Sequence, residues 1–449
     1  MEKLEQLESR YYVALIVFVA SIFFLSRLYE PSLSGDAAKY ALIAKNMLKS
    51  GNFLVPSLTI DSYFKKPPFF FWIIALSFKI FGFNEFAARL PSALFAIFDS
   101  VLIYFLVRKI STSRIVALLS SLVFILNFEV IRISTTVRFE SFLLFINLLT
   151  IIVLQKVDLL RTLLIGILVG IGLLTKGPFA FLGLFALIIV NLMRKDWRSI
   201  AYLILTSLIA LSLFGIYILY MLYYYPQFLQ EFFGRQIIGR FEGTLNEGTP
   251  RPFYFYERII LKHFWIWNVF LIYFLYMAFR LLRNKRFSEI SELFLVKDKK
   301  LFLSFFFFFL VTYVPLHLIS IKFTRYSYYL YPFLSFVVAN VILRLSLVRF
   351  VLIYVFTVVF IYGFAVMICP CTFHKDKLKD LRPLVEVGLS NYSPLGVKSS
   401  AFDRTVVYAL LFYFDDLNMK FPEYLVSSGK DCRNSLLRYK DFCIVKVEK

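Results

Sequence analysis

Long apolar stretches recur along most of this chain, and each has about the length of a helix that crosses a lipid bilayer. The stretches run for about 17 to 23 residues, and a helix of about 20 residues spans the roughly 30 Å hydrocarbon layer. Of the 449 residues, 60% are hydrophobic and only 18% are charged, too few to cover a water-soluble globule of this size. The sequence therefore predicts an all-α polytopic membrane protein.

Hydropathy predicts about eleven transmembrane helices. The predicted crossings are residues 12–28, 87–107, 114–130, 139–155, 160–176, 178–194, 199–223, 259–281, 301–318, 327–345 and 349–368. The block 67–82 begins with two prolines and contains a lysine, so we predict that it does not cross. No small-residue cleavage site follows the first apolar block, which indicates an uncleaved anchor with a cytoplasmic N-terminus.

Basic residues predict the orientation of the chain. With the N-terminus inside, every predicted inner loop is rich in Lys and Arg, as the positive-inside rule expects. An odd number of spans then places residues 369–449 outside, and this tail holds all four cysteines, Cys369, Cys371, Cys432 and Cys443. Disulfides form in oxidising compartments, so the cysteines support the same orientation. Their pairing stays open, and four free thiols clustered by chance are the alternative.

Two predicted outer loops interrupt the spans, residues 29–86 and 225–258. In the first, apolar residues repeat at helical spacing between Asp36 and Gly51, which predicts an amphipathic helix in the membrane interface. Its polar face carries Lys39, Lys45 and Lys49. The second loop is rich in aromatic residues and arginine, which favour the interface.

The chain is thus predicted to have two domains. Residues 1–368 form the transmembrane domain, and residues 369–449 have shorter apolar runs with prolines and polar residues between them. This tail is predicted to be a small α/β domain of about 80 residues, a size at which disulfides help a core to persist.

The formal net charge of +21 comes largely from the inner loops and requires no nucleic acid. The informative remainder lies on the predicted outer side: Lys65, Lys66, Arg132, Arg138, Lys176, Arg235, Arg240, Arg251, Arg258, Lys322 and Arg325. A cation near the hydrocarbon boundary costs free energy unless it snorkels to water or has a partner. The cluster therefore predicts an anionic ligand such as a lipid phosphate.

Several motifs occur in a fixed order along the chain. The first outer loop has an acid before the amphipathic helix, then YFKKPP, then FGFNEFAARLPS. Further motifs are VRFES at Val137–Ser141, LLTKGP at Leu173–Pro178, FFGRQIIGRF at Phe232–Phe241 and KFTRYSYYLYPFL at Lys322–Leu334. Together they resemble the bacterial GT-C glycosyltransferases, in particular the aminoarabinose transferases that act on lipid A and the related protein mannosyltransferases. The resemblance covers about residues 10–345 and leaves the tail unmatched.

Members of this family transfer a sugar from a polyprenyl phosphate, such as undecaprenyl phosphate, to an acceptor on the outer face, usually with inversion. By resemblance, Asp36 takes the position of the proposed catalytic base, and Lys66 that of a lysine near the lipid phosphate. The family usually has EKPP where this chain has Lys65, so a metal-ligating carboxylate known in some members is missing. The family's second acid is usually Asp, and Glu140 stands in its place.

The residues themselves support the same chemistry, because cleavage of a sugar–phosphate bond needs cations for the leaving group and a base for the acceptor. Asp36 is the first choice for the base, and its alternative is a plain helix N-cap. Glu140 either orients the acceptor or pairs structurally with Arg138. We assign no metal ligands and leave the cofactor open, because His263 and His317 at span edges are typical of structural histidines.

Phosphate binding is assigned to cations of the outer side. The candidates are Lys66, Arg138, Lys322, Arg325, Arg235 and Arg240, together with Tyr326. Arg235 and Arg240 rank lower, because five positions on a helix do not place two side chains on one face. For each cation the alternative is simple snorkelling to the interface.

The predicted function is transfer of a sugar from a polyprenyl-phosphate donor at the outer face of a bacterial inner membrane. The acceptor is lipid A or lipopolysaccharide core, another glycolipid, or protein, and the other partners are membrane lipids. The alternative is a transporter or flippase of a polyprenyl-linked anion, which should carry ionisable groups near the bilayer midplane. The spans are nearly free of such groups, which favours chemistry at one face. A noncatalytic scaffold would leave the outer acid without a purpose.

Overall fold

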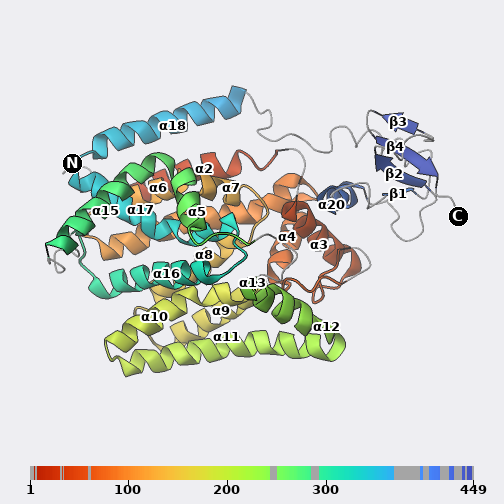
Figure 1. The fold of residues 1–449 in the computed structure, drawn as a ribbon, viewed down its shortest axis with the longest axis horizontal. Coiled ribbons are helices and arrows are strands. Elements are labelled where there is room, and N and C mark those ends of the chain that lie inside the picture. The colour runs from red at the N-terminus through yellow and green to blue at the C-terminus, as the bar shows by residue number, and fades with distance from the viewer. Residues whose placement is uncertain are drawn as a thin grey trace. The chain divides into compact units, whose positions relative to one another are not determined.

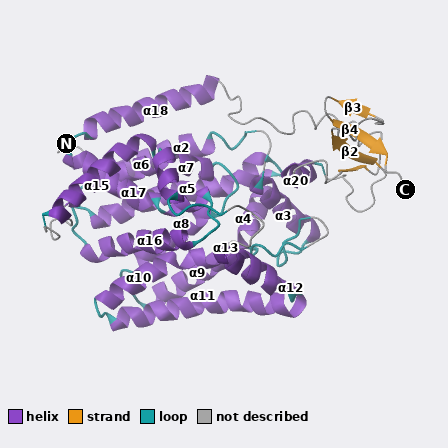
Figure 2. Ribbon diagram, in the orientation of Figure 1, coloured by secondary structure: helices purple, strands orange, loops and turns teal. Residues whose placement is uncertain are grey.

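A computed structural model gives the fold of the chain, shown in Figures 1 and 2. It describes residues 5, 8–30, 33, 35–58, 62–242, 250–284, 293–368, 395–397, 404–414, 424–428, 437–439 and 442–446. Contacts between residues divide the chain into two units. The first comprises Met1–Arg27, Phe64–Phe70 and Ser92–Ile368, and the second comprises Leu28–Tyr63, Phe71–Pro91 and Cys369–Lys449.

Helices occupy each of the predicted crossings. They are α2 (Ser9–Leu25), α5 (Glu85–Ile110), α6 (Arg114–Ile125), α7 (Phe128–Ser134), α8 (Glu140–Val153), α9 (Leu159–Lys176), α10 (Leu182–Met193), α11 (Trp197–Tyr224), α14 (Phe255–His263), α15 (Asn268–Arg283), α16 (Lys299–Leu318), α17 (Tyr331–Arg344) and α18 (Val348–Ile368). Side-chain caps at Ser113, Asp158, Asp196 and Asp298 begin α6, α9, α11 and α16. Each cap oxygen accepts an N–H of the first helical turn, which would otherwise lack a partner.

Length and composition support a multi-pass membrane protein. Among the described residues, six helices are long and apolar enough to cross a bilayer, or seven if the bent pair α6–α7 is one span. The two helices of that pair meet at 65°. The helices α2, α8 and α17 have 17, 14 and 14 residues, which is short for a crossing. The number of eleven crossings therefore stays a prediction.

Two glycines let helices of the first unit approach closely. A Cβ on Gly166 would lie 2.9 Å from the side chain of Ile209, and one on Gly170 would lie 2.9 Å from Leu213. Both neighbours belong to α11, which packs along α9 (Figure 1). Small residues serve this purpose in membranes, where close van der Waals packing holds helices together. Elsewhere in this unit α10 packs on α16, and α6 packs on α17.

The second unit contains the predicted amphipathic helix with the predicted bounds. Helix α3 runs from Asp36 to Ser50, and Gly51 ends it with a φ of 70° while donating its N–H to Met47 O. The tail helix α20 (Arg404–Tyr413) packs on α3. Lys45 was predicted to lie on the polar face of α3, and this is wrong. Its side chain is buried, and its Nζ donates to Phe412 O at the end of α20.

Tyr413 ties the start of α3 to α5 within the same unit. Its hydroxyl accepts the N–H of Leu33 at 3.0 Å and donates to Glu85 Oε1 at 2.8 Å. Leu33 lies three positions before Asp36. The tail, which no motif matched, therefore holds the segment that carries the predicted base.

The described strands all lie in the tail. They are β1 (Leu395–Val397), β2 (Tyr424–Ser428), β3 (Leu437–Tyr439) and β4 (Phe442–Lys446), in the sheet order β1-β2-β4-β3. Strand β1 is parallel to β2, and the other two pairings are antiparallel. Cys443 pairs with Ser427 in the β2–β4 register, whereas Cys369, Cys371 and Cys432 lie outside the described residues. The disulfides and the α/β tail domain stay predictions.

Candidate active site

A buried carboxylate and a buried ammonium group face each other in the first unit. Glu140 is the first residue of α8, and Lys176 is the last residue of α9. Lys176 Nζ donates to Glu140 Oε1 at 2.5 Å, and the two side chains are 3% and 1% exposed. Such a pair has lost its hydration, so each charge depends on the other. Glu140 was predicted to be a site residue, whereas its partner Lys176 was counted among the outer cations but not assigned to the site.

The two helix ends are fixed by the motifs around them. Ser92 Oγ donates to Arg138 O at 2.9 Å and accepts the N–H of Arg138 at 3.0 Å, and Ser141 Oγ donates to Ser92 O at 2.9 Å. These bonds join the end of FGFNEFAARLPS to VRFES. After Lys176, Gly177 turns the chain with a φ of 69°, a conformation that favours glycine. The turn ends α9 at the lysine.

The motif KFTRYSYYLYPFL places a second cation and a tyrosine beside the Glu140–Lys176 pair. The 3-10 segment η5 (Thr324–Tyr329) carries Arg325, whose Nε lies 3.7 Å from Glu140 Oε1. It also carries Tyr326, a buried residue whose ring centroid lies 4.6 Å from Lys176 Nζ. The arrangement sets one carboxylate against two cations. Its local excess of positive charge suits an anionic ligand.

A cavity of about 250 Å³ adjoins this cluster. Two lysines, Lys66 and Lys176, and Tyr326 belong to its lining. The rest of the lining is mostly apolar and comes from η1 (Gly177–Phe181), α10, α16 and the residue Phe232. Ammonium groups in an apolar wall match an amphiphile with an anionic head and a hydrocarbon chain.

Of the other predicted phosphate contacts, Arg138 acts electrostatically on the Glu140 carboxylate, whereas Lys322 and Arg235 have other partners. Lys322 Nζ donates to Ile319 O at 2.5 Å and to Arg251 O at 3.5 Å. Burial lowers the pKa of the Lys322 ammonium group, and the nearby Glu257 opposes this shift. Arg235 is exposed and pairs with Glu231 in the π-helical segment η2 (Gln230–Ile238).

Helix α13 (Gly239–Glu242) follows, and the side chain of its Arg240 lies outside the described residues.

Asp36 belongs to the second unit. It is the first residue of α3, and Gly35 with a φ of 59° precedes it as the cap. The alternative reading of Asp36 as an N-cap is therefore wrong. Its Oδ1 lies 3.0 Å from Lys39 Nζ, and the side chain is 25% exposed. A carboxylate in the first turn is favoured by the helix dipole, and partial exposure leaves it accessible.

The two histidines of the described residues, His263 and His317, lie beside glutamates. His317 Nδ1 lies 2.7 Å from Tyr313 O, and His317 Nε2 lies 2.8 Å from Glu257 Oε1. His263 Nδ1 lies 3.0 Å from Glu129 Oε2, an oxygen that also accepts from Arg132 Nε at 2.8 Å. Within the described ranges, no three His, Cys, Asp or Glu side chains gather as a metal-binding group.

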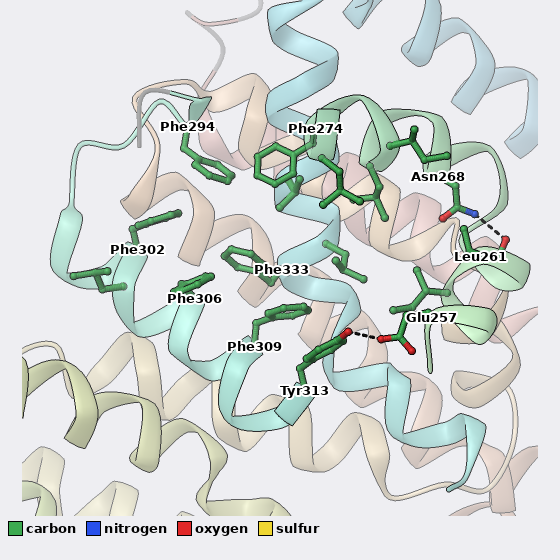
Figure 3. Close-up of a pocket in the computed structure, with 17 residues that line it drawn as sticks. Glu257, Leu261, Asn268, Phe274, Phe294, Phe302, Phe306, Phe309, Tyr313 and Phe333 are labelled. Carbon is green, nitrogen blue, oxygen red and sulfur yellow. Dashed lines mark hydrogen bonds between the residues drawn. The ribbon is translucent and has the colours of Figure 1, made fainter. Parts of the chain in front are cut away.

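A second, larger cavity lies among α14, α15, α16 and α17 (Figure 3). Its volume is about 770 Å³, and phenylalanines dominate the wall, among them Phe306 and Phe309 of α16 and Phe333 of α17. The few polar groups include Glu257, which accepts a hydrogen bond from the Tyr313 hydroxyl, and Asn268, which donates to Leu261 O at 2.8 Å. An apolar cavity of this size is suited to hydrocarbon chains.

Sequence comparisons relate the chain to known transferases. Residues 65–220 match the family described as dolichyl-phosphate-mannose-protein mannosyltransferase. An undecaprenyl phosphate-α-4-amino-4-deoxy-L-arabinose arabinosyl transferase of Wigglesworthia glossinidia brevipalpis is 27% identical over 289 residues, covering 62% of this chain and 51% of that protein. An uncharacterized protein of Aquifex aeolicus is 34% identical over 248 residues, covering 55% of this chain and 58% of its own length. The chain thus spans about half the length of these curated relatives.

Structural comparisons relate the fold to two solved proteins. ArnT from Cupriavidus metallidurans, solved with undecaprenyl phosphate bound, has a TM-score of 0.74 at 15% identity and covers 98% of both chains. The archaeal oligosaccharyltransferase AglB from Archaeoglobus fulgidus has a TM-score of 0.54 at 13% identity, covering 93% of this chain and 69% of that one. The resemblance that the motifs indicate is confirmed in sequence and in fold.

Proposed function

We propose that this chain, a relative of the GT-C glycosyltransferases in sequence and in fold, transfers a sugar from a polyprenyl phosphate to an acceptor. The observation that carries the proposal is the cavity lined by Lys66 and Lys176 beside the buried Glu140. A polyprenyl phosphate is an amphiphile with an anionic head, and this lining offers two ammonium groups within an apolar wall. The Wigglesworthia relative is named for a lipid of this kind, and the Cupriavidus structure was solved with one bound.

In the reaction, an acceptor hydroxyl oxygen attacks the anomeric carbon of the sugar, and the bond from that carbon to the phosphate oxygen breaks. The bonding electrons leave with the polyprenyl phosphate, whose negative charge Lys66, Lys176 and Arg325 stabilise. Glu140 holds Lys176 and Arg325 in place through its carboxylate. The proton of the acceptor hydroxyl passes to a carboxylate, for which Asp36 is the candidate.

The acceptor is proposed to be carried on a lipid. The phenylalanine-lined cavity of about 770 Å³ supports this, because it offers room for acyl chains separately from the cavity that contains the two lysines. Its polar residues differ as well, with Glu257 and Tyr313 instead of ammonium groups. A carboxylate disfavours a phosphate and suits a hydroxyl or amino group.

The proposed topology has eleven spans, a cytoplasmic N-terminus and a tail outside the inner membrane, with the tail forming a small α/β domain. The basic inner loops and the four tail cysteines support it. Labelling of Cys432 by a membrane-impermeant thiol reagent after reduction tests this orientation. A tail that reacts only after the membrane is opened would contradict it.

Donor binding should weaken by about 10- to 150-fold when Lys66 is replaced by alanine, because a charge-assisted contact worth about 1.5–3 kcal/mol is lost. The measurement is the Kd of the purified chain for polyprenyl phosphate in detergent. Lys79→Ala is the matched control, because Lys79 is an exposed lysine of α4 (Phe69–Phe81). An equal loss in both variants, or none in either, would contradict a phosphate site at Lys66.

A further inference from the structure

One ionisable residue lies deep inside a membrane-spanning helix. Asp99 is near the middle of α5 (Glu85–Ile110), and its side chain is fully buried. A carboxyl group in this position is costly in a bilayer, and such residues are rare unless they face the protein interior and have a partner. The apolar run around Asp99 belongs to no motif of the sequence. The spans were predicted to be nearly free of ionisable groups near the midplane, and Asp99 is an exception to that prediction.

Within the described residues, Tyr328 is the hydrogen-bond partner of Asp99. Tyr328 OH donates to Asp99 Oδ2 at 3.0 Å, across 229 positions of sequence, and both residues lie in the first unit. Tyr328 is itself fully buried, and its ring meets Phe124 edge-on at 5.6 Å. In the described part of the chain, Asp99 Oδ1 makes no hydrogen bond. The contact therefore joins the centre of α5 to the segment η5.

The segment η5 is the one that brings Arg325 to 3.7 Å from Glu140 and Tyr326 against Lys176. It is a six-residue 3-10 turn, whose internal hydrogen bonds have poorer geometry than those of an α-helix. Side-chain contacts from other elements must then fix its position. Among them are the bond from Arg132 to Thr324 Oγ1 at 3.0 Å, the bond from Tyr328 to Asp99, and the packing of Phe179 against Tyr326 and Tyr329.

We propose that Asp99 is a positioning residue, which through Tyr328 holds η5 so that Arg325 and Tyr326 stay against the Glu140–Lys176 pair. The proposal deepens the proposed function and rests on it for its catalytic readout. A displacement of about 1 Å at a reacting group can cost about 10²-fold in rate. Asp99 acts on the reaction only through this turn.

A purely structural role makes a different prediction, because activity would then follow stability. Removing one partner of a buried hydrogen bond leaves the other unsatisfied and destabilises the fold. Replacing both partners by apolar groups of similar shape is often neutral or stabilising. The double variant Asp99→Leu/Tyr328→Phe therefore separates the two roles, since it regains stability without regaining the hydrogen bond that holds η5.

The experiment is a double-mutant cycle on the full chain in detergent, with Asp99→Leu, Tyr328→Phe and the double variant. We measure the Tm, kcat and KM for the polyprenyl-phosphate sugar, and amide hydrogen exchange of residues 324–329. Each single variant should lower kcat/KM by about 10- to 100-fold, and the double variant should lose no more than the larger single effect. The Tm of the double variant should equal or exceed those of the single variants.

Two further variants keep the test decisive. Asp99→Asn retains an acceptor oxygen, so it should recover most of the transfer lost in Asp99→Leu. Tyr104→Phe removes a buried hydroxyl on the same helix that has no hydrogen bond to a described residue, so its activity should stay within about two-fold of wild type. Transfer that tracks the Tm across all variants, or additive losses in the cycle, would overturn the positioning role.

Hydrogen exchange separates failure of this proposal from failure of the proposed function. Exchange at residues 324–329 should be faster in Asp99→Leu and Tyr328→Phe than in wild type, whatever reaction the chain catalyses. Unchanged exchange at these residues would overturn the proposal that Asp99 holds η5 in place. If the wild-type chain transfers no sugar, but exchange at residues 324–329 is still faster in the two variants than in wild type, only the proposed function is contradicted.

Discussion

Replacing Lys176 by methionine should lower sugar transfer by about 10²–10³-fold, the usual cost of losing one group that stabilises a developing oxyanion. Lys176 is one of two lysines in the lining of the smaller cavity, and its ammonium is held by Glu140 at 2.5 Å. The substitution also leaves the Glu140 carboxylate buried opposite a neutral side chain. Breaking such a pair costs about 3–5 kcal/mol of stability.

Folding and chemistry are separated by a second variant. Glu140→Gln combined with Lys176→Met contains no unpaired charge from this pair, so it should regain much of the stability while transfer remains low. Lys262→Met is the matched control, because Lys262 is an exposed lysine of α14. Transfer, donor binding and thermal unfolding are measured for all three. Recovery of transfer in the double variant would reduce Lys176 to a structural partner of Glu140.

Asp36→Asn should lower transfer by about 10²–10⁴-fold, the range expected for a positioned general base. An amide does not take the proton of an acceptor hydroxyl at neutral pH. The fold should survive, because Gly35 caps α3 and the loss of one charge from the first turn costs only about 0.3–1 kcal/mol. Donor binding should persist, since a negative charge does not attract a phosphate.

The matched control for Asp36 is Glu85→Gln. Glu85 is also the first residue of its helix and belongs to the same unit, so the control removes an equivalent helix-terminal charge. The glutamine keeps an oxygen that can accept the bond from Tyr413. Transfer by the control should stay within about two-fold of wild type. Near-normal transfer by a folded Asp36→Asn variant would remove Asp36 as the base and leave Glu140 as the candidate.

The helices could be predicted from the sequence because apolar periodicity and caps are local signals. Every predicted crossing contains a helix, and α3 has the bounds that Asp36 and Gly51 indicate. Position on a helix was not enough to place Lys45. Its spacing assigned it to a solvated face, but α20, more than 350 positions away, covers it. No pattern within α3 announces that partner.

The candidate site could be predicted only in part, for the same physical reason. Glu140, Arg325 and Tyr326 were identified through charge and family motifs, and the structure brings them together. The Glu140–Lys176 pair joins helix ends 36 positions apart, a distance that no periodicity encodes. LLTKGP and the outer position of Lys176 were the available signals. Asp99 gave one signal, an acid inside an apolar span, but no local pattern announces its partner Tyr328, which lies 229 positions away.

The most direct test is transfer by the purified chain in detergent, where no sealed membrane separates two compartments. The donor is a polyprenyl phosphate carrying a labelled sugar, and the acceptors are a hydroxyl-bearing glycolipid and, in parallel, a peptide. We predict labelled glycolipid together with an equal amount of released polyprenyl phosphate, and no labelled peptide. Intact donor in detergent, combined with movement of that donor across sealed vesicles that contain the chain, would contradict a transferase and identify a transporter.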